Sequence, residues 1–239
     1  SAQNLNQLLK GNFNGSYENY TQYYMQDNEI GAVLPPDKFG SNGFLKLDYN
    51  YGKFSAGIQI ESYLPSILGY FPINIENQTK IINKYFKYTD KKFSVQVGDF
   101  YEQFGSGLSL RAYEDRALGY DNMLDGVRLK ITPMKGLEIK TVYGKQRYAF
   151  IEGQIQHSPG VVRGFDGELH LNEAFKLLSE KKLDITVGGS FVSKYQRDDN
   201  DALILPENVG CYGGRTKLRY GKWAFDAEYV IKEQDPSQD

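Results

Sequence analysis

The densest group of residues able to do chemistry lies in one stretch of the chain, from Gly98 to Tyr120. An arginine guanidinium can bind a carboxylate through two parallel hydrogen bonds, so we expect at least one arginine of this stretch to pair with an acid nearby. Gly105 and Gly107 permit a tight reversal of the chain. The stretch is therefore predicted to leave the regular structure and fold as a loop held by ion pairs. Its ionisable residues are Asp99, Glu102, Arg111, Glu114, Asp115 and Arg116.

Three uses of this charged loop follow from its residue types. A loop that narrows a water-filled pore would set charges of both signs across the path of solutes, as charged rings do in channels. A loop folded against a wall would instead serve only to hold that wall together. An acid–base pair of two neighbouring carboxylates is the least favoured use, because no partner group is indicated.

Other residues that could act in catalysis are few. The chain has two histidines, His157 and His170, and one cysteine, Cys211. His157 stands beside Ser158, but a single such pair is typical of an exposed loop and not of an activated nucleophile. We therefore expect no enzyme activity, no cofactor and no metal site.

The elements that must position the charged loop alternate apolar and polar residues. In the segment 53–63, Ile58 and Ile60 alternate with Gln59 and Glu61. Successive side chains of a strand leave it on opposite faces, so this segment predicts a strand with one apolar and one polar face. Segments near 127–131, 183–191 and 223–231 repeat the pattern.

Short turns and long connections divide the strands into hairpins. The strands are predicted at 12–25, 41–51, 53–63, 80–88, 92–101, 124–132, 137–147, 161–176, 183–195, 211–220 and 222–232. Short turns fall at 51–53, 89–92, 133–136, 179–182 and 220–222, and long connections at 26–40, 64–79, 102–123, 148–160 and 196–210. Tight turns on one side and long loops on the other are typical of an up-and-down barrel of the bacterial outer membrane.

We therefore predict an all-β fold, an antiparallel up-and-down transmembrane β-barrel of about eleven strands. Ile58, Val187 and Phe225 are expected to face lipid, and arginine at Ile58 or Val187 should destabilise by about 2 to 4 kcal/mol, with a smaller cost at Thr186. A soluble sandwich would show the same alternation with its apolar faces buried. The residues predicted to face the lumen are Gln59, Glu61, Arg128, Lys130, Lys217, Arg219, Asp226 and Glu228.

Aromatic residues at the strand ends favour the membrane interpretation, because Tyr and Trp suit the headgroup region. In a soluble sheet the same rings would form cross-strand pairs worth roughly 0.2 to 1 kcal/mol each. The rings beside the short turns are Tyr49, Tyr51, Phe54, Tyr88, Phe93, Tyr220 and Trp223. Those expected to form an outer girdle are Tyr63, Tyr101, Tyr143, Tyr195 and Tyr229.

Composition bounds the remaining alternatives. The net charge of −2 gives no general attraction to nucleic acid, and no run of eighteen apolar residues predicts a helical span. We expect a short helix or periplasmic leader over 1–10 and one outer-membrane barrel over 11–239. Eleven strands would leave an unpaired edge in hydrocarbon, which is costly, so we expect a larger barrel that is incomplete at the carboxyl end.

Two motifs carry a resemblance to a known family. They read Gly-Asp-Phe-Tyr-Glu-Gln-Phe-Gly-Ser-Gly-Leu over 98–108 and Leu-Arg-Ala-Tyr-Glu-Asp-Arg-Ala-Leu-Gly over 110–119. With them the chain resembles a large, functionally uncharacterised family of Gram-negative outer-membrane barrels. The resemblance implies the fold and the location, and it brings no catalytic residues.

Two functions follow from these expectations. The first is a conduit for solutes, lined by the polar faces and narrowed by the charged loop. The second is a non-transporting subunit or scaffold of a secretion, assembly or surface-binding complex. The expected partners are outer-membrane lipid and, through the loops 64–79 and 102–123, other envelope proteins, with no nucleic acid.

Overall fold

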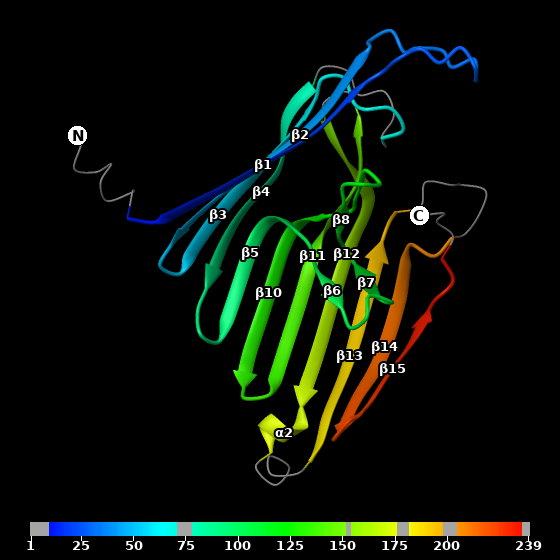
Figure 1. Ribbon diagram of the computed structural model, residues 1–239. Coiled ribbons are helices and arrows are strands. Elements are labelled where there is room, and N and C mark those ends of the chain that lie inside the picture. The colour runs from blue at the N-terminus through cyan, green and yellow to red at the C-terminus, as the bar shows by residue number, and fades with distance from the viewer. Residues whose placement is uncertain (1–9, 71–77, 152–153, 176–181, 198–204, 236–239) are drawn as a thin grey trace. The chain divides into compact units, whose positions relative to one another are not determined.

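The computed structural model of the chain describes residues 10–70, 78–151, 154–175, 182–197 and 205–235. In this part of the chain, eleven long strands form an antiparallel sheet in which each strand lies beside its sequence neighbours (Figure 1). The strands are β1 (Asn12–Tyr23), β2 (Phe39–Tyr51), β3 (Phe54–Tyr63), β4 (Gln78–Thr89), β5 (Phe93–Phe100), β10 (Leu124–Met134), β11 (Leu137–Ile151), β12 (Gln154–His170), β13 (Leu183–Tyr195), β14 (Asn208–Tyr220) and β15 (Trp223–Lys232).

Five short elements complete the described structure. Between β5 and β10, strand β6 (Gln103–Phe104) pairs with β7 (Leu110–Arg111), and β8 (Glu114–Asp115) pairs with β9 (Tyr120–Asp121). Helix α2 (Leu171–Ala174) follows β12. Within the described residues, helices are too short or too polar to cross a membrane.

The predicted fold class is confirmed as an antiparallel, up-and-down sheet of eleven strands, and β13 has the predicted bounds. The strand predicted at 161–176 is wrong at both ends, because β12 covers Gln154–His170 and occupies most of the expected 148–160 loop. The strand stops early because the amide of Asn172 bonds the backbone of Leu183 and Ile185 and turns the chain into α2. The predicted leader and most of the 179–182 turn lie outside the described residues.

The chain divides into two compact units. Unit 1 comprises residues 1–88, 114–121 and 147–157, and unit 2 comprises residues 89–113, 122–146 and 158–239. Unit 1 therefore contains β1 to β4 with the β8–β9 hairpin. Unit 2 contains β5, β10 and β13 to β15, most of β11 and β12, and the β6–β7 hairpin.

In unit 2, burial is opposite on the two faces of the sheet. We call the side that contacts β6–β7 the hairpin face of this unit; there Thr186, Asp166 and Arg215 are buried. On the opposite, outer face, Val187 and Phe225 are 38% and 59% exposed. Further exposed apolar residues of the outer face are Val97, Val127, Tyr143, Phe165, Phe191 and Tyr212.

Unit 1 shows the same arrangement on its own strands. Its hairpin face, which contacts β8–β9, buries Gln59 and Glu61. Ile58 and Ile60, on the other side of β3, are half-buried, and Ile81 and Phe86 of β4 are exposed there. Lys84, opposite Ile58 in the ladder, also lies on this outer face.

The expected outer girdle of tyrosines is wrong at Tyr63. This residue has the same parity as Gln59 and Glu61 in β3, so it lies on the hairpin face, where it is 2% exposed. Its hydroxyl donates a hydrogen bond to Glu61 at 2.7 Å. Tyr143, Tyr195 and Tyr229 are exposed, as a girdle position requires.

The apolar core of unit 2 lies beneath its hairpin. Phe104 is fully buried among the side chains of Val142, Val162 and Val192. Gly164 makes the room: a Cβ there would stand 2.7 Å from the Phe104 ring and 2.9 Å from Val142. Figure 1 shows β6 and β7 in front of the strands that carry these residues.

A row of three glycines crosses the outer face of unit 2. Gly167 of β12 is in register with Gly189 of β13, which is in register with Gly214 of β14. A Cβ at Gly214 would meet nothing within 4 Å, and at Gly189 the first neighbour would be 3.4 Å away. Neither ladder shifts register here, so packing and bulges do not require these glycines.

Candidate functional site

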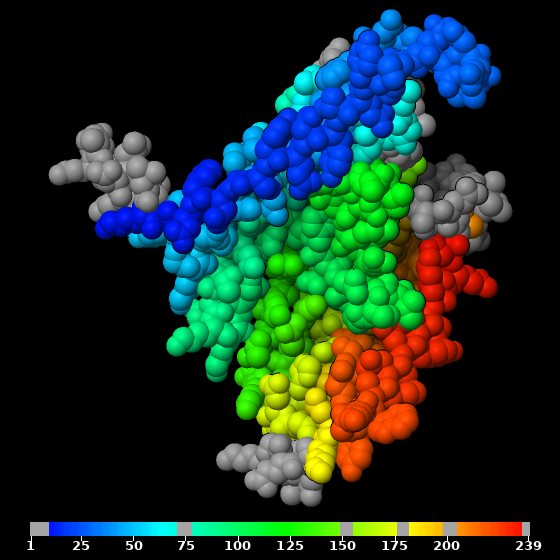
Figure 2. Space-filling model, viewed as in Figure 1, coloured from blue at the N-terminus to red at the C-terminus, as the bar shows by residue number. Residues whose placement is uncertain are grey.

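The segment between β5 and β10 leaves the sheet, as the charge pattern predicted, but it does so two residues later than expected. β5 continues through Asp99, which is in register with Asp125 and is 5% exposed. The ladder with β10 keeps its register up to Phe100, but the alternation of β5 is disturbed just before Asp99, because Gly98 has φ +97°. The segment 101–123 then forms the two small hairpins. In the space-filling view, the green atoms of the β6–β7 hairpin, which belongs to unit 2, stand in front of the strands of that unit (Figure 2).

In unit 1, one buried arginine joins the β8–β9 hairpin to the wall. The Arg147 guanidinium contacts Asp121 of β9 at 2.6 Å and Glu61 of β3 at 3.4 Å. All three side chains are at most 7% exposed. Gln59 adds a hydrogen bond of 3.1 Å to Glu114 of β8. We call these residues, with Arg116 and Glu18, the Arg147 cluster.

The exposed end of the Arg147 cluster is built on Arg116. Its guanidinium contacts Glu114 at 2.9 Å and Glu18 of β1 at 2.7 Å, and lies 4.9 Å from the centre of the Phe44 ring. Burial would lower the pKa of Arg116, but the hydrogen bonds and charges of Glu114 and Glu18 outweigh it and raise that pKa. The predicted pairing of Arg111 or Arg116 with a nearby acid is thus confirmed for Arg116.

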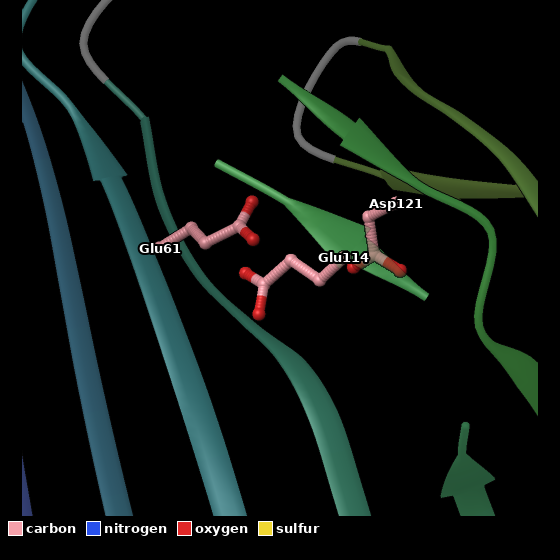
Figure 3. Close-up of side chains that lie close together, drawn as sticks. All are labelled: Glu61, Glu114 and Asp121. Atoms are coloured by element: carbon pink, nitrogen blue, oxygen red, sulfur yellow. The ribbon is translucent and has the colours of Figure 1, made fainter. Parts of the chain in front are cut away.

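Three carboxylates of the Arg147 cluster lie close enough to share a cation. Oxygen atoms of Glu61, Glu114 and Asp121 are within 4.8 Å of one another, and Figure 3 shows these side chains converging from β3 and the β8–β9 hairpin. Carboxylate oxygens suit hard cations such as Ca²⁺. Arg147 already places a positive charge against two of these acids, so the group is balanced in part without a metal.

In unit 2, Glu102 holds the base of the β6–β7 hairpin. Its carboxylate accepts a hydrogen bond from Lys140 at 3.0 Å and contacts Arg128 at 3.5 Å. Arg128 also donates to the Tyr101 carbonyl and to Gln96. These contacts tie the hairpin to β5, β10 and β11.

A second buried arginine, Arg215, lies in unit 2 and pairs with acids of the sheet strands. Arg215 of β14 bonds both oxygens of Asp166, at 2.7 and 3.0 Å, and Glu168 at 3.0 Å. Lys217 shares Glu168 at 3.4 Å. The guanidinium lies over Gly188, where a Cβ would stand 2.7 Å from it. We call Arg215, Asp166, Glu168 and Lys217 the Arg215 cluster.

The other predicted loop residues do not all join an ion pair. Arg111 is exposed and stacks on Tyr113, 4.3 Å from the ring centre. Asp115 accepts hydrogen bonds from the backbone N–H groups of Ala117 and Leu118 and so shapes the β8–β9 turn.

Strand parity places all eight residues predicted to face a lumen on the hairpin faces. Glu228 bonds the backbone of Ser106, Lys130 pairs with Glu138, and Arg219 and Asp226 are exposed. Whether these faces line a lumen stays a prediction.

Sequence reasoning missed Arg147 and Asp166. Arg147 has the opposite parity to the buried Val142 of its own strand, so alternation gave no signal for its burial. Asp166 lies inside both the predicted strand 161–176 and the observed β12, but its pairing with Arg215 of β14 left no signal in the sequence. Gly188 and Gly213 are close-packing sites, because a Cβ there would stand 2.7 Å from the Arg215 guanidinium and from the Ser190 hydroxyl, respectively.

The described features define a class: an antiparallel all-β protein whose apolar outer faces are exposed and whose charged faces carry two inserted hairpins. Over residues 2–239 the chain matches the model described as "Family of unknown function (DUF6029)". The chain therefore belongs to the DUF6029 family.

Comparisons with characterised proteins add little to this assignment. A search of curated proteins found no match. Among solved structures, the chain is similar to a BenF-like porin from Pseudomonas fluorescens Pf-5, at 12% identity and a TM-score of 0.46. The similarity covers 94% of this chain and 68% of that chain.

Proposed function

We propose that this chain is an outer-membrane β-barrel protein that conducts solutes along its hairpin faces, with the segment 101–123 as a charged constriction. One observation carries the proposal: in both units, apolar side chains on the outer face are exposed, while polar and charged side chains beside the hairpins are buried. In unit 2, Phe165 is 46% exposed while its neighbour Asp166 is 3% exposed. A water-soluble sheet has the opposite preference, whereas a strand between lipid and an aqueous lumen needs this one.

The geometry of the hairpins supports a constriction. Charges of both signs lie in or beside them: Arg116 and Glu114 of β8–β9 and Glu102 at the base of β6–β7 are half-buried, and the two acids bond polar side chains of the sheet. Charges fixed by ion pairs beside an aqueous path produce a local field that acts on passing ions.

Lipid contact can be tested through the single tryptophan of the chain, Trp223. In a Trp223→Phe background, we expect tryptophan at Val187 to be strongly quenched by lipids brominated deep in the acyl chains. Tryptophan at Thr186, the next residue on the hairpin face, is expected to show little quenching. Equal quenching at both positions, or none at Val187, would reject the membrane assignment.

Conduction can be tested in planar bilayers. Replacing Arg111 and Arg116 together by glutamine should change single-channel conductance or ion selectivity, because both guanidinium groups lie in the charged segment. Replacing Lys91 and Lys92, exposed in the β4–β5 turn, removes the same charge as a control and should leave both properties unchanged.

A second candidate function is a non-transporting envelope scaffold. The full burial of Phe104 on the hairpin face of unit 2 favours it, because an apolar anchor fixes the hairpin in place. A scaffold would show no channel before mutation, and the arginine substitutions would then mainly lower its stability.

A further inference from the structure

The β6–β7 hairpin of unit 2 is attached at its base by contacts that are hard to break. Phe104 is 0% exposed and sits over Gly164. Glu102, two residues before Phe104, forms ion pairs with Lys140 and Arg128. The Ala112 N–H returns to the Glu102 carbonyl at 2.9 Å and closes the base.

The tip of the same hairpin, residues 105–108, is attached to the wall by one side chain. Within the hairpin, the Gly107 N–H donates to the Phe104 carbonyl at 2.9 Å and the Gln103 side-chain amide donates to the Gly105 carbonyl at 3.1 Å. The backbone N–H of Ser106 donates a hydrogen bond to Glu228 Oε2 of β15 at 2.7 Å. Leu108 is 63% exposed and Ser106 is also exposed. Past the tip, Ser109 donates to the Ser190 hydroxyl at 3.1 Å, a neutral contact on β13.

Two glycines flank the bonded residue, and each has a left-handed backbone conformation. Gly105 has φ +55° and Gly107 has φ +98°. A Cβ at Gly105 would collide with Glu228 Oε1, so only glycine allows the carboxylate to approach the Ser106 N–H. Glycine also turns about φ and ψ at lower steric cost than other residues, which makes these two positions natural pivots.

We propose that residues 105–108 form a releasable latch: Glu228 holds the tip against β15, and the tip swings about Gly105 and Gly107 when that bond is lost, while Phe104 stays seated. The asymmetry of the two attachments carries this inference. One charge-assisted hydrogen bond at the tip is much weaker than a fully buried aromatic side chain with two ion pairs beside it.

The latch would also regulate the width of the passage. This part of the inference rests on the proposed function. Glu228 lies on the hairpin face of β15, in register with Arg215 of β14. In a conduit, release of the tip would free the hairpin face near β15 and widen the passage there.

Deuterium labelling of backbone amides tests the latch without any transport measurement. The reporter is the Gly107 N–H of the folded full chain, which donates to the Phe104 carbonyl at 2.9 Å and is freed only if the tip swings. Glu228→Ala should raise the labelling rate of this amide at least about tenfold, the factor expected for loss of one hydrogen bond to a charged group. Glu228→Gln keeps an acceptor oxygen and should give a smaller increase.

Two controls separate latch release from general loosening. Glu173→Ala removes a carboxylate from exposed α2 and should leave the rate unchanged. A second reporter, the Ala112 N–H bonded to Glu102 at the base, should stay slow in Glu228→Ala. An unchanged rate at position 107, or an equal rise at position 112, would overturn the latch.

Bilayer recordings then test the regulatory part separately. Glu228→Ala should increase conductance or the open fraction relative to Glu173→Ala. If the unmutated chain forms no channel, the proposed conduit fails while the labelling result still decides the latch. If the chain conducts and labelling rises, but conductance does not change, the latch stands and its control of the passage is overturned.

Discussion

The Arg147 cluster of unit 1 and the Arg215 cluster of unit 2 use the same chemistry for different purposes. Each has a buried arginine, 6% and 5% exposed, between two carboxylates. Arg147 connects a wall strand, β3, to the inserted β9. Arg215 connects only wall strands, β12 and β14, across β13. The first arginine therefore positions a hairpin, and the second stiffens the wall.

The comparison teaches that a hairpin can be fixed by charge or by apolar burial. In unit 1 the β8–β9 hairpin is held by Arg147, Arg116 and the Gln59–Glu114 hydrogen bond. In unit 2 the buried ring of Phe104 holds β6–β7, assisted by Glu102. Salt and charge substitutions should thus act mainly on the hairpin of unit 1, and changes of side-chain volume mainly on that of unit 2.

The largest expected effect comes from Arg147→Met. The change leaves Glu61 and Asp121 without their shared partner in a buried site, and breaking such a pair costs about 3 to 5 kcal/mol. Arg215→Met should cost less, because Lys217 still neutralises Glu168. Urea unfolding of the detergent-folded protein, followed by Trp223 fluorescence and circular dichroism, measures both variants. A larger loss for Arg215→Met would reverse the assigned roles.

The second-largest loss of stability is expected for arginine substitution on the outer face. Arginine at Val187 should destabilise by about 2 to 4 kcal/mol in vesicles, because the charge would face hydrocarbon. Ser94, half-buried on the hairpin face of β5, offers the control, since arginine there would face polar neighbours such as Lys130 and Glu138. Equal costs at the two sites would mean that the faces do not differ in environment.

A matched glycine pair isolates the apolar anchor of unit 2. Gly164→Ala forces the Phe104 ring to move and should cost about 1 to 3 kcal/mol, as overpacked cores do. Gly214→Ala enters open space on the outer face and should be nearly neutral. The same unfolding assay compares them, and indifference to Gly164→Ala would show that Phe104 is not tightly seated.

The smallest effect is expected for Arg116→Gln. Arg116 lies at the exposed end of its cluster, where pairing with Glu114 contributes roughly 1 kcal/mol or less. The loss should shrink further in 1 M salt, because exposed ion pairs are screened. A salt-independent loss would instead point to the packing of Arg116 on Phe44 as the main contribution.

Alternation predicted the sheet well because it depends on one strand at a time. Neighbouring residues such as Thr186 and Val187 differ in polarity, and the structure separates them by face as expected. The same rule assigned to one face all eight residues that were predicted to face a lumen, and the strand register places all eight on the hairpin faces.

Partner choice could not be predicted in this way, because it depends on register and on where the inserted hairpins sit. Arg215 lies opposite Glu228 in the β14–β15 ladder, yet its guanidinium turns over Gly188 toward Asp166. Arg147 breaks the alternation of β11, so only the fold reveals its burial.

The glycine row Gly167–Gly189–Gly214 has a mechanical consequence for unit 2. Three adjacent strands lack side chains at the same height of the outer face. Side-chain contacts between neighbouring strands are therefore missing there, and they do not oppose bending of the sheet. Glycines at such positions permit sharp curvature in β-sheets. We therefore expect bending of this part of the sheet to concentrate along the glycine row. Larger residues at these three positions should make the sheet more rigid without contacting either ion-pair cluster.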